Sequence, residues 1–375
     1  MDLLTALKLI FWLCLVLLAQ IYIFYPITLR LLSLFSRKSK NSENFCPDKI
    51  SIIISAHDEE AVIEEKIRNT LALDWQKEKV EILIGDDGST DKTAEIAAKF
   101  SEVRLVKKEK NEGKAAMLNN LCSMAKGEIF LFSDANTMLK NDALKNLVAE
   151  FADRKVACVC GQLLLKSSGD SSLSKTEEIY WKSESYLKEM ESNFGAVMGS
   201  NGALYAIRSE LYSTLPTHKT VMDDFYITAK ILMKNRSCVF CKNAQAYENT
   251  STSKYGEFKR KIRIGRANFN FLFAYLPLLN PLYPMKAYIF LSHKLLRWFS
   301  PFLLLSVFFS SIFLMDEHIF YKTFFALELL FIIAALLGLR ICNYFLSVNT
   351  AMFLGFCKSF FKEEGGRWER VERQK

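Results

Sequence analysis

The sequence predicts an α/β domain, with a mixed, mainly parallel sheet covered by helices on both faces, joined to α-helical transmembrane segments. Two observations lead to this prediction. Short β-branched runs alternate with amphipathic stretches through the middle of the 375-residue chain, a pattern typical of parallel sheets. Long apolar runs lie near the two ends of the chain, and they hold much of its 50% hydrophobic content.

Residues 1–35 are expected to form an N-terminal transmembrane anchor. The run 3–32 is almost continuously apolar, and at about 1.5 Å per residue it can cross a hydrocarbon layer of about 30 Å. Its length and its bulky residues favour an uncleaved anchor over a signal peptide. Because positive charge stays on the inner side of a membrane, the domain that follows is expected to be cytoplasmic. The basic residues at this end of the anchor are Arg30, Arg37, Lys38 and Lys40.

Residues 45–255 are expected to form that cytoplasmic domain. Its strands are short β-branched or aromatic runs bounded by polar residues, and its helices repeat apolar residues at helical spacing. We expect, in order, strand 50–55, helix 59–73, strand 80–85, helix 90–100, strand 103–106, helix 114–125 and strand 128–132, with later strands in 156–165 and 237–240. Ligands bind beyond the carboxyl ends of parallel strands, so the residues that follow each strand mark the expected site.

Polar clusters follow three of these strands, at residues 56–59 (AHDE), 86–89 (DDGS) and 133–136 (SDAN). A glycine-rich G-x-G-x-x-G turn and a G-x-x-x-x-G-K-[ST] loop are both missing from the sequence, which argues against a dinucleotide enzyme and a P-loop NTPase. The net charge is +8, but the middle domain has no basic helix or basic-aromatic stripe, so no nucleic-acid partner is expected.

Asp134 is placed to hold a divalent cation together with the phosphates of a nucleotide sugar, which need charge neutralisation when the sugar–phosphate bond breaks. Asn136 can add a carbonyl oxygen to the same cation. A simple turn is the alternative for these two residues.

Asp86 and Asp87 stand together at the end of the second strand. A carboxylate there can accept hydrogen bonds from a nucleobase or a ribose. Capping of the next helix by Ser89 or Thr90 is the simpler explanation of the cluster, but capping does not require two adjacent carboxylates.

Asp223 and Asp224 form a third acidic element. Displacing a nucleoside diphosphate with an acceptor hydroxyl requires one base, and direct displacement inverts the anomeric carbon. A helix N-terminus also favours acids, and both explanations can hold together.

Arg263 and Arg266 lie three residues apart on one helix face and can bind a leaving diphosphate. Attraction to anionic lipid head groups is preferred for the basic residues at 259–261.

Residues 256–298 are expected to contain interfacial helices. The stretches 256–276 and 284–298 mix apolar and basic residues, which is typical of helices lying on a membrane surface.

Residues 299–361 are expected to contain two further spans, 299–315 and 319–339, joined by a short acidic turn. The stretch 343–361 is expected to be interfacial or re-entrant. A fourth span would place the basic tail, residues 362–375, outside.

The nine cysteines show no regular framework, as expected in a reducing compartment. Cys158 and Cys160 lie in one strand-like run, and Cys238 and Cys241 in another. Nothing in the sequence brings the two pairs together, so buried inert thiols are favoured over a structural zinc site.

From about residue 50 to Arg266 the chain resembles the family 2 glycosyltransferases of the GT-A fold. Its flanking apolar segments resemble the membrane-bound cellulose, hyaluronan and poly-GlcNAc synthases of that family. The resemblance rests on the order of the motifs SAHDEE, GDDGSTD, NEGKAAMLN, FSDANT, GSNGALYAIR, MDDFYIT and RIGR.

The resemblance implies roles for individual residues. Asp134 matches the first acid of the metal motif, and Asp224 matches the catalytic base. Arg263 and Arg266 fall where processive synthases have Gln-x-x-Arg-Trp. The implied acceptor loop is Gly199, Ser200, Asn201 and Gly202. The implied donor-binding residues are Ala56, His57, Glu59, Asp86, Asp87, Lys114, Asp134, Arg263 and Arg266.

The chain departs from the family pattern at a few positions. Asn136 replaces the second metal-binding acid, which removes a charge from the metal site, and Asp223 replaces a glutamate. Arg263 replaces the glutamine, and Ala267 replaces the tryptophan that packs against the acceptor in processive enzymes. The last change favours single transfer over polymer synthesis.

The predicted function is an inverting hexosyltransferase that uses a nucleotide-sugar donor, a UDP-sugar, together with Mg²⁺ or Mn²⁺. The predicted acceptor is a lipid-linked sugar or a glycan at the cytoplasmic face of the cell membrane, in envelope glycan or glycolipid synthesis. Membrane lipids are expected contacts, and a homo-oligomer or an export partner is left open. The alternatives are a processive polysaccharide synthase and an inactive, nucleotide-sugar-binding membrane partner of a synthase complex.

Overall fold

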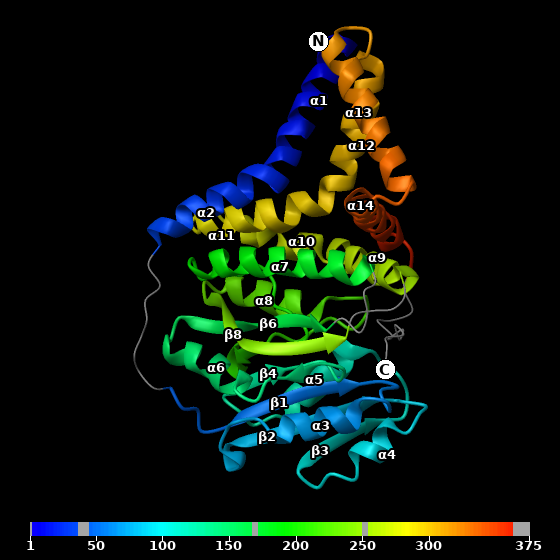
Figure 1. The fold of residues 1–375 in the computed structure, drawn as a ribbon. Coiled ribbons are helices and arrows are strands. Elements are labelled where there is room, and N and C mark those ends of the chain that lie inside the picture. Colours follow the sequence, from blue (N-terminus) through cyan, green and yellow to red (C-terminus); the bar gives the residue numbers. More distant parts are fainter. Residues whose placement is uncertain (1, 37–44, 167–171, 250–253, 363–375) are drawn as a thin grey trace.

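A mixed sheet forms the centre of the molecule (Figure 1). The computed structural model describes residues 2–36, 45–166, 172–249 and 254–362. The strand order is β3-β2-β1-β4-β7-β6-β8-β5. The strands are β1 (Ile50–Ala56), β2 (Val80–Asp87), β3 (Val103–Lys108), β4 (Ile129–Phe132), β5 (Met138–Leu139), β6 (Val156–Lys166), β7 (Tyr205–Arg208) and β8 (Ser237–Asn249).

The pairing confirms the predicted mixed sheet. β3, β2, β1 and β4 are parallel neighbours, and β6 is parallel to β8. β7 lies between β4 and β6 and is antiparallel to both, while β5 is antiparallel to β8. The parallel block brings the carboxyl ends of β1, β2 and β4 to one edge of the sheet.

Helices cover both faces of the sheet because side chains alternate along each strand. Ile53 of β1 and Phe132 of β4 belong to one core cluster, whereas Ile52 and Leu131 belong to the other. The first face is covered by α5 (Lys114–Met124), α7 (Ser172–Ser192) and α8 (Asp223–Met233). The second face is covered by α3 (Ile63–Leu71), α4 (Thr93–Ala97) and α6 (Ala143–Ala149).

The predicted elements of the domain are all present, with different ends. The helices expected at 59–73 and 90–100 are shorter, because α3 begins at Ile63 and α4 at Thr93. The strand expected at 237–240 continues to Asn249 as β8, since it pairs with β6 along the length of that strand.

Three helices are long and apolar enough to cross a membrane by length and composition, within the part of the chain that the structure describes. The first, Leu3–Phe35, joins α1 (Leu3–Ala19) to α2 (Tyr25–Phe35) through a π-helical turn. The second, Pro284–Leu314, joins α11 (Pro284–Ile289) to α12 (Leu296–Leu314) in the same way, and the third is α13 (Ile319–Leu336). The stretches 284–298 and 299–315, expected as separate helices, are therefore continuous.

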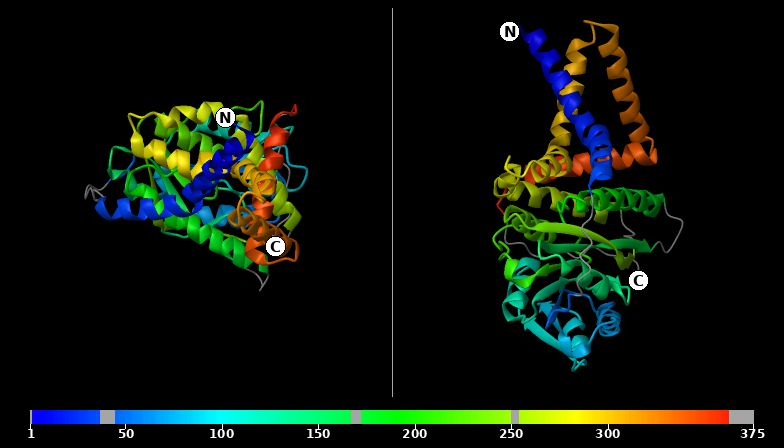
Figure 2. Two further views of the ribbon diagram at one scale, coloured as in Figure 1. Left: turned by 90° about the horizontal axis from the view of Figure 1, so that it is seen from above. Right: turned by 90° about the vertical axis from the view of Figure 1, so that its left-hand side faces the viewer.

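The long helices change direction between their two halves. In Figures 1 and 2, α1, α12 and α13 project together away from the sheet domain, whereas α2 and α11 lie across its top. The N-terminus lies beside the turn between α12 and α13, where Lys8 Nζ is 2.9 Å from a carboxylate oxygen of Glu317. The expected basic residues Arg37, Lys38 and Lys40 and the tail from residue 363 lie outside the described residues.

A layer of helices separates the projecting helices from the sheet domain. It contains α9 (Lys254–Asn270), α10 (Leu272–Tyr275) and α14 (Arg340–Ser359). α14, the segment expected to be interfacial or re-entrant, is not among the three helices that are long and apolar enough to span. α9 and α14 cross closely at Gly355, where an added Cβ would lie 2.7 Å from the main-chain nitrogen of Arg266.

A buried network of charged residues fastens α2 and the π-helical turn before α12 to α7. The hydroxyl of Tyr25 donates to Glu191 at 2.6 Å. His293 contacts Glu191 through Nδ1 and lies 3.2 Å from Glu184 through Nε2. The imidazole of His293 therefore lies between two carboxyl groups, one at each ring nitrogen. Glu191 also accepts from the main-chain nitrogen of Met198 at 2.9 Å, so the network reaches the loop that follows.

Candidate active site

A single cavity of about 1740 Å³ lies at the carboxyl edge of the parallel strands. It is closed by the loop 199–202 and the N-terminus of α8. The residues predicted from sequence that line it are His57, Glu59, Lys114, Asp134, Asn136, Gly199, Ser200, Asn201, Gly202, Asp224 and Arg263. Ala56, Asp86, Asp87 and Arg266, which were predicted with them, are not part of the cavity wall.

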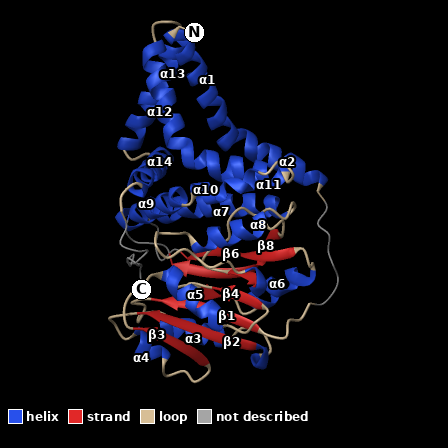
Figure 3. Cartoon of the chain, turned by 180° about the vertical axis from the view of Figure 1, so that it is seen from behind, coloured by secondary structure: helices blue, strands red, loops and turns tan. Residues whose placement is uncertain are grey.

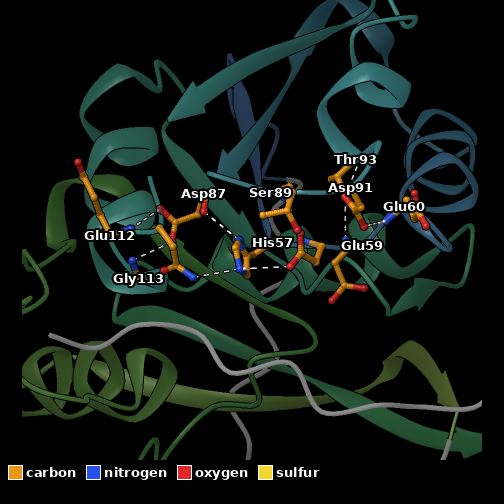
Figure 4. A network of polar contacts seen from close by, with 12 residues as sticks. His57, Glu59, Glu60, Asp87, Ser89, Asp91, Thr93, Glu112 and Gly113 are labelled. Atoms are coloured by element: carbon orange, nitrogen blue, oxygen red, sulfur yellow. Dashed lines mark hydrogen bonds and ion pairs between the residues drawn. The ribbon is translucent and has the colours of Figure 1, made fainter. Parts of the chain in front are cut away.

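His57, directly after β1, is fixed by hydrogen bonds to two other loops (Figure 4). Its Nδ1 donates to the main-chain oxygen of Asp87 at 2.9 Å, since a carbonyl oxygen only accepts. Its Nε2 lies 3.0 Å from the side-chain nitrogen of Asn111. These contacts fix the plane of the imidazole in the cavity wall.

Asp87 uses its carboxylate to hold the loop that precedes α5. It accepts hydrogen bonds from the main-chain nitrogens of Glu112 at 3.0 Å and Gly113 at 2.7 Å. Burial raises the pKa of Asp87, and these two hydrogen bonds partly offset that rise. Through this loop Asp87 positions Lys114, the first residue of α5. Direct contact between Asp87 and a donor nucleotide stays a prediction.

Ser89 and Thr90, which follow Asp87, connect their loop to the loop after β1 and do not cap α4. The hydroxyl of Ser89 accepts from the main-chain nitrogen of Asp58 at 2.9 Å, and Thr90 donates its main-chain N–H to the Asp58 carboxylate at 2.7 Å. Asp91 accepts from the main-chain nitrogen of Thr93, where α4 begins. The capping role considered for Ser89 and Thr90 is therefore wrong.

Asp86 lies behind the cavity wall, beside Ala56 on the neighbouring strand. Its side chain is fully buried, and neither carboxylate oxygen has a hydrogen-bond partner among the described residues. The two adjacent aspartates therefore have different surroundings, which the sequence does not distinguish.

Lys114 joins the acidic elements of the site. Its ammonium nitrogen lies 2.8 Å from Oδ1 of Asp134 and 3.3 Å from Oδ2 of Asp223. Burial lowers the pKa of Lys114, but Asp134 and Asp223 outweigh burial and raise it above the ordinary value. Lys114 is therefore positively charged at neutral pH.

The loop that carries Asp134 is held from below by Lys66 of α3. The ammonium group of Lys66 donates to the hydroxyl of Ser133 at 2.7 Å and to the main-chain oxygen of Thr137 at 2.6 Å. Lys66 is fully buried. Lys66 belongs to no sequence motif. Its position on the apolar face of α3, next to Ile67, is the one sequence feature that indicates a buried lysine.

Asn136 also faces the cavity, and its side-chain nitrogen donates to Glu248 at 3.3 Å. No group of three or more His, Cys, Asp or Glu side chains forms a metal cage among the described residues. Mg²⁺ is typically held by one or two carboxylates, with waters and substrate phosphates completing its shell. Asp134 therefore fits a cation that is shared with a phosphorylated ligand.

Asp224 lies in the first turn of α8, where acids are favoured. Its carboxylate accepts from the main-chain nitrogens of Gly202 at 3.1 Å and Phe225 at 2.7 Å. Burial and the neighbouring carboxylate of Asp223 raise the pKa of Asp224 to about 6. Such a group is ionised at neutral pH and is basic enough to accept a proton.

The loop 199–202 brings the charged groups together. A Cβ added to Gly202 would lie 3.5 Å from Oδ2 of Asp134, 3.9 Å from Oδ2 of Asp224 and 3.9 Å from Nζ of Lys114. One point therefore lies within hydrogen-bonding or van der Waals reach of all three side chains. Ser200 fastens the loop to α8, since its hydroxyl donates to the main-chain oxygen of Asp224 at 3.1 Å.

α9 contributes one of its two predicted arginines to the cavity. Arg263 lines the wall, whereas the guanidinium of Arg266 donates to the main-chain oxygen of Phe361 at 2.9 Å, near the end of α14. Ala267 is buried, with 1% exposure.

A tryptophan from another helix lines the cavity beside Phe225. Trp298 of α12 packs edge to face on Phe225, with ring centroids 5.5 Å apart. Sequence reasoning did not identify it, because it lies in a segment expected to be an interfacial helix.

The two cysteine pairs are neighbours in the sheet, contrary to the expectation that nothing brings them together. Cys158 of β6 pairs with Cys238 of β8, and Cys160 and Cys241 lie close along the same strands. All four thiols are free and buried. Burial raises the pKa of Cys160 to about 11, so this thiol is unreactive at neutral pH.

Comparison with known proteins places the sheet domain among glycosyltransferases. The sequence model described as glycosyl transferase family 2 matches residues 51–215. A β-monoglucosyldiacylglycerol synthase of Nostoc sp. is 24% identical over 190 residues, which cover 48% of this chain and 41% of that protein. A poly-β-1,6-N-acetyl-D-glucosamine synthase of Staphylococcus aureus is 26% identical over 243 residues, which cover 61% of this chain and 58% of that protein.

Among solved structures, the mannosyltransferase PcManGT of Pyrobaculum calidifontis, in complex with GDP-Man and Mn²⁺, has a similar fold. It superposes with a TM-score of 0.73 at 21% identity, covering 95% of this chain and 100% of that chain. The similarity includes the helices outside the sheet domain. The predicted GT-A fold is confirmed by this likeness and by the sheet order, and the part of the sheet domain at residues 51–215 is similar in sequence to glycosyl transferase family 2.

Proposed function

We propose that this protein is an inverting glycosyltransferase that moves a sugar from a nucleotide donor, a UDP-sugar, to a lipid-linked or glycan acceptor. The observation that carries the proposal is the convergence of Lys114, Asp134 and Asp224 around Gly202. A base, a cation and a carboxylate that suits a metal ion meet in a buried cleft at the carboxyl edge of a parallel sheet. Sugar transfer from a nucleotide requires these groups.

Asp224 is the proposed base. Its carboxylate takes the proton of the attacking acceptor hydroxyl as that oxygen bonds to the anomeric carbon. The bond from the anomeric carbon to the diphosphate breaks on the opposite face, so the configuration inverts. Asp224 is held in place through Phe225 and Gly202, and its pKa near 6 suits proton transfer at neutral pH.

Lys114 and Asp134 are proposed to receive the leaving diphosphate. Asp134 would hold Mg²⁺ or Mn²⁺, which would supply positive charge to the phosphates, and Asn136 would lie beside it. Lys114 adds a positive charge from the protein itself. The Mn²⁺ in the PcManGT complex supports this assignment.

The donor and acceptor classes rest partly on the relatives. The names of the two synthases describe transfer of glucose to a lipid and of N-acetylglucosamine to a growing chain, sugars that are carried by UDP. The chain spans about half the length of these relatives. Single transfer to a lipid-linked or glycan acceptor is favoured over processive synthesis because Ala267 stands where processive enzymes of the family have a tryptophan.

The proposed cleft faces the cytoplasm, where nucleotide sugars are made. The three candidate spans support a multi-pass membrane protein. The basic residues near the first span support the inner location of the sheet domain.

A donor screen tests this proposal. Purified protein in detergent with native lipid extract and Mn²⁺ is incubated with UDP-glucose, UDP-galactose, UDP-N-acetylglucosamine and GDP-mannose, and release of the nucleotide is measured. We expect release from one UDP-sugar, loss of release with EDTA, and a fall of about 10²–10⁴-fold in Asp224→Asn.

The matched control for that variant is Glu189→Gln, which removes a carboxylate on the exposed side of α7. Its side chain is 43% exposed and pairs with Lys242, and it should retain full activity. Binding of a UDP-sugar without turnover in the wild-type protein would instead identify an inactive membrane partner. Products of rising length on a gel would identify a processive synthase.

A further inference from the structure

The cavity extends from the charged residues around Gly202 to α14, which lies between the sheet domain and the projecting helices α12 and α13 (Figure 1). Figure 3 shows α9, α10 and α14 between the sheet and the helices α12 and α13. The wall at this end includes Tyr22, Leu339, Ile341, Phe345 and Val348. This second end is lined largely by apolar and aromatic side chains, in contrast to the carboxylates around Gly202.

Lys294 enters the cavity where these two ends meet. It belongs to the π-helical turn before α12, and a Cβ on Gly199 would lie 3.8 Å from its Cε. Its ammonium group forms no hydrogen bond and no ion pair with the described residues, although its side chain is largely enclosed. An enclosed, unpaired cation costs free energy unless a partner arrives.

Arg297 lies one helical turn later and also lines the cavity. One of its terminal nitrogens donates to Glu184 at 2.5 Å. Its Nε is buried and has no hydrogen-bond partner among the described residues. A second donor in this part of the cavity is therefore unsatisfied.

The carboxylates of the neighbouring buried network do not need Lys294. Glu184 is paired with both His293 and Arg297, and Glu191 is paired with His293 and Tyr25. Both carboxylates therefore have hydrogen-bonding partners other than Lys294.

Lys188 of α7 adds a second ammonium group beside the loop 199–202. Its ammonium group lies 3.5 Å from the main-chain oxygen of Ser200 and 3.7 Å from the sulfur of Cys160. Neither partner is a carboxylate. Lys188 and Lys294 therefore flank the loop 199–202 with two ammonium groups that make no ion pair among the described residues.

Building on the proposed sugar transfer, we propose that Lys294, Arg297 and Lys188 bind the phosphate or diphosphate of a lipid-linked acceptor. The lipid chain would lie against the apolar wall near Phe345 and Val348, and the sugar attached to the phosphate would reach Asp224 over the loop. A neutral diacylglycerol head group would leave the cationic groups unpaired. The carboxylates around Gly202 repel the phosphate, which keeps it at the membrane end.

Equilibrium binding tests this subsite without requiring catalysis. The probes are geranylgeranyl diphosphate, the uncharged alcohol geranylgeraniol, and inorganic diphosphate, titrated calorimetrically into full-length protein in detergent. Binding is measured with the donor site saturated with UDP and Mn²⁺, so that a diphosphate cannot occupy that site. Titration of UDP alone into the same preparations reports the donor site separately.

We expect the diphosphate lipid to bind at least about tenfold more tightly than the alcohol, and inorganic diphosphate to bind weakly. Lys294→Gln should weaken binding of the diphosphate lipid by about tenfold, and Lys294→Arg should restore most of it. Binding of UDP should be the same in both variants. The matched control is Lys358→Gln, which removes an exposed cation of α14 that is not part of the cavity wall, and it should bind like the wild-type protein.

Equal binding of the alcohol and the diphosphate lipid, or unchanged binding in Lys294→Gln, would overturn the phosphate subsite. Inorganic diphosphate binding as tightly as the lipid would show an anion site that does not recognise a lipid, and would overturn the acceptor assignment. Failure of the wild-type protein to bind UDP would count against the proposed function, and the comparison of the diphosphate lipid in wild-type protein and Lys294→Gln would still report on the subsite.

Discussion

The ammonium group of Lys114 lies 2.8 Å from a carboxylate oxygen of Asp134, across the carboxyl edge of the sheet. The two residues come from α5 and from the loop after β4, and they meet because β1 lies between β2 and β4. The same ammonium group is 3.3 Å from Asp223. Lys114 therefore holds the acidic residues together in the absence of donor, and it is placed to meet a diphosphate when donor binds.

Replacing Lys114 should weaken donor binding. Lys114→Met removes the positive charge between Asp134 and Asp223, which leaves adjacent carboxylates to repel both each other and the donor phosphates. We expect the Kd for the UDP-sugar to rise by at least about tenfold, which corresponds to about 1.4 kcal/mol. The measurement is calorimetric titration with and without Mn²⁺. Lys110→Met, which removes a cation from the exposed loop before α5, is the control, and equal Kd values in the two variants would exclude this role.

Transfer should depend on the ionisation of Asp224. Burial and Asp223 raise the pKa of this carboxyl to about 6, and only the ionised form accepts a proton. We expect kcat/KM to be level above pH 7 and to fall about tenfold per unit below about pH 6. A level profile between pH 5 and pH 8 would show that Asp224 is not the base.

Ionisation of Asp224, which is required for transfer, should lower the stability of the folded protein. A carboxyl whose pKa is raised by folding destabilises the native state when it is ionised, so the cost is present above about pH 6 and is absent below its unfolded value of about 3.9. The melting temperature of Asp224→Asn in detergent should therefore exceed that of the wild-type protein at pH 8, with little difference at pH 4.

Restoring a carboxylate at position 136 should strengthen metal binding. In Asn136→Asp the new carboxylate would face both Asp134 and the Glu248 that now accepts from Asn136 at 3.3 Å. Repulsion should lower the melting temperature in EDTA, and Mn²⁺ should raise it by more than in the wild-type protein. Half-maximal activity should then require less Mn²⁺. Identical Mn²⁺ titrations of the two proteins would place residue 136 outside the metal site.

Breaking the buried network should destabilise the junction between α2, α7 and the helix Pro284–Leu314. Glu191→Gln removes the carboxylate that contacts His293 and accepts from Tyr25 in a fully buried site. Removing one partner of a buried ion pair typically costs about 3–5 kcal/mol. Thermal unfolding in detergent should show a clear loss, while Glu189→Gln on the exposed side of the same helix should change stability by less than about 1 kcal/mol. Comparable melting temperatures for the two variants would show that the network contributes little.

Labelling of single cysteines should establish which side of the membrane holds the sheet domain. Cys46 is exposed and lies just before β1, and Asp316 lies in the turn between α12 and α13. In intact cells a membrane-impermeant maleimide should label Asp316→Cys in a Cys46→Ser background, and should label Cys46 only after permeabilisation. Labelling of Cys46 in intact cells would place the domain outside.

The succession of strands along the chain and the acidic residues at their ends could be predicted from the sequence, whereas the order of the strands in the sheet could not. Each strand is a local run of β-branched residues, and the polar residue that follows a parallel strand must lie at the shared edge. His57 and Asp134 line one cavity for this reason. Lys114, implied by the family resemblance, and Asp224 of the third acidic element line the same cavity. The apolar runs near the two ends of the chain likewise predicted the candidate spans, because length and composition are local properties.

Other features depended on which distant segments pack together. Cys158 meets Cys238 because β6 and β8 are parallel neighbours, and a strand pattern specifies the faces of a strand but not its partner. Lys66 supports the Asp134 loop because α3 packs beneath that loop.

The part of the cavity lined by α9, α12 and α14 also combines features that the sequence predicted with features that only packing decided. The sequence identified α9 as a basic helix, but the packing of α9 against α14 turned Arg266 away from the cavity, and the bend before α12 brought Lys294 and Trp298 to it. The sequence by itself determined the chemistry available at each strand end. Only the tertiary structure decided which cations are neutralised and which enter the cavity, because charge balance in a buried site depends on contacts between residues far apart in the chain.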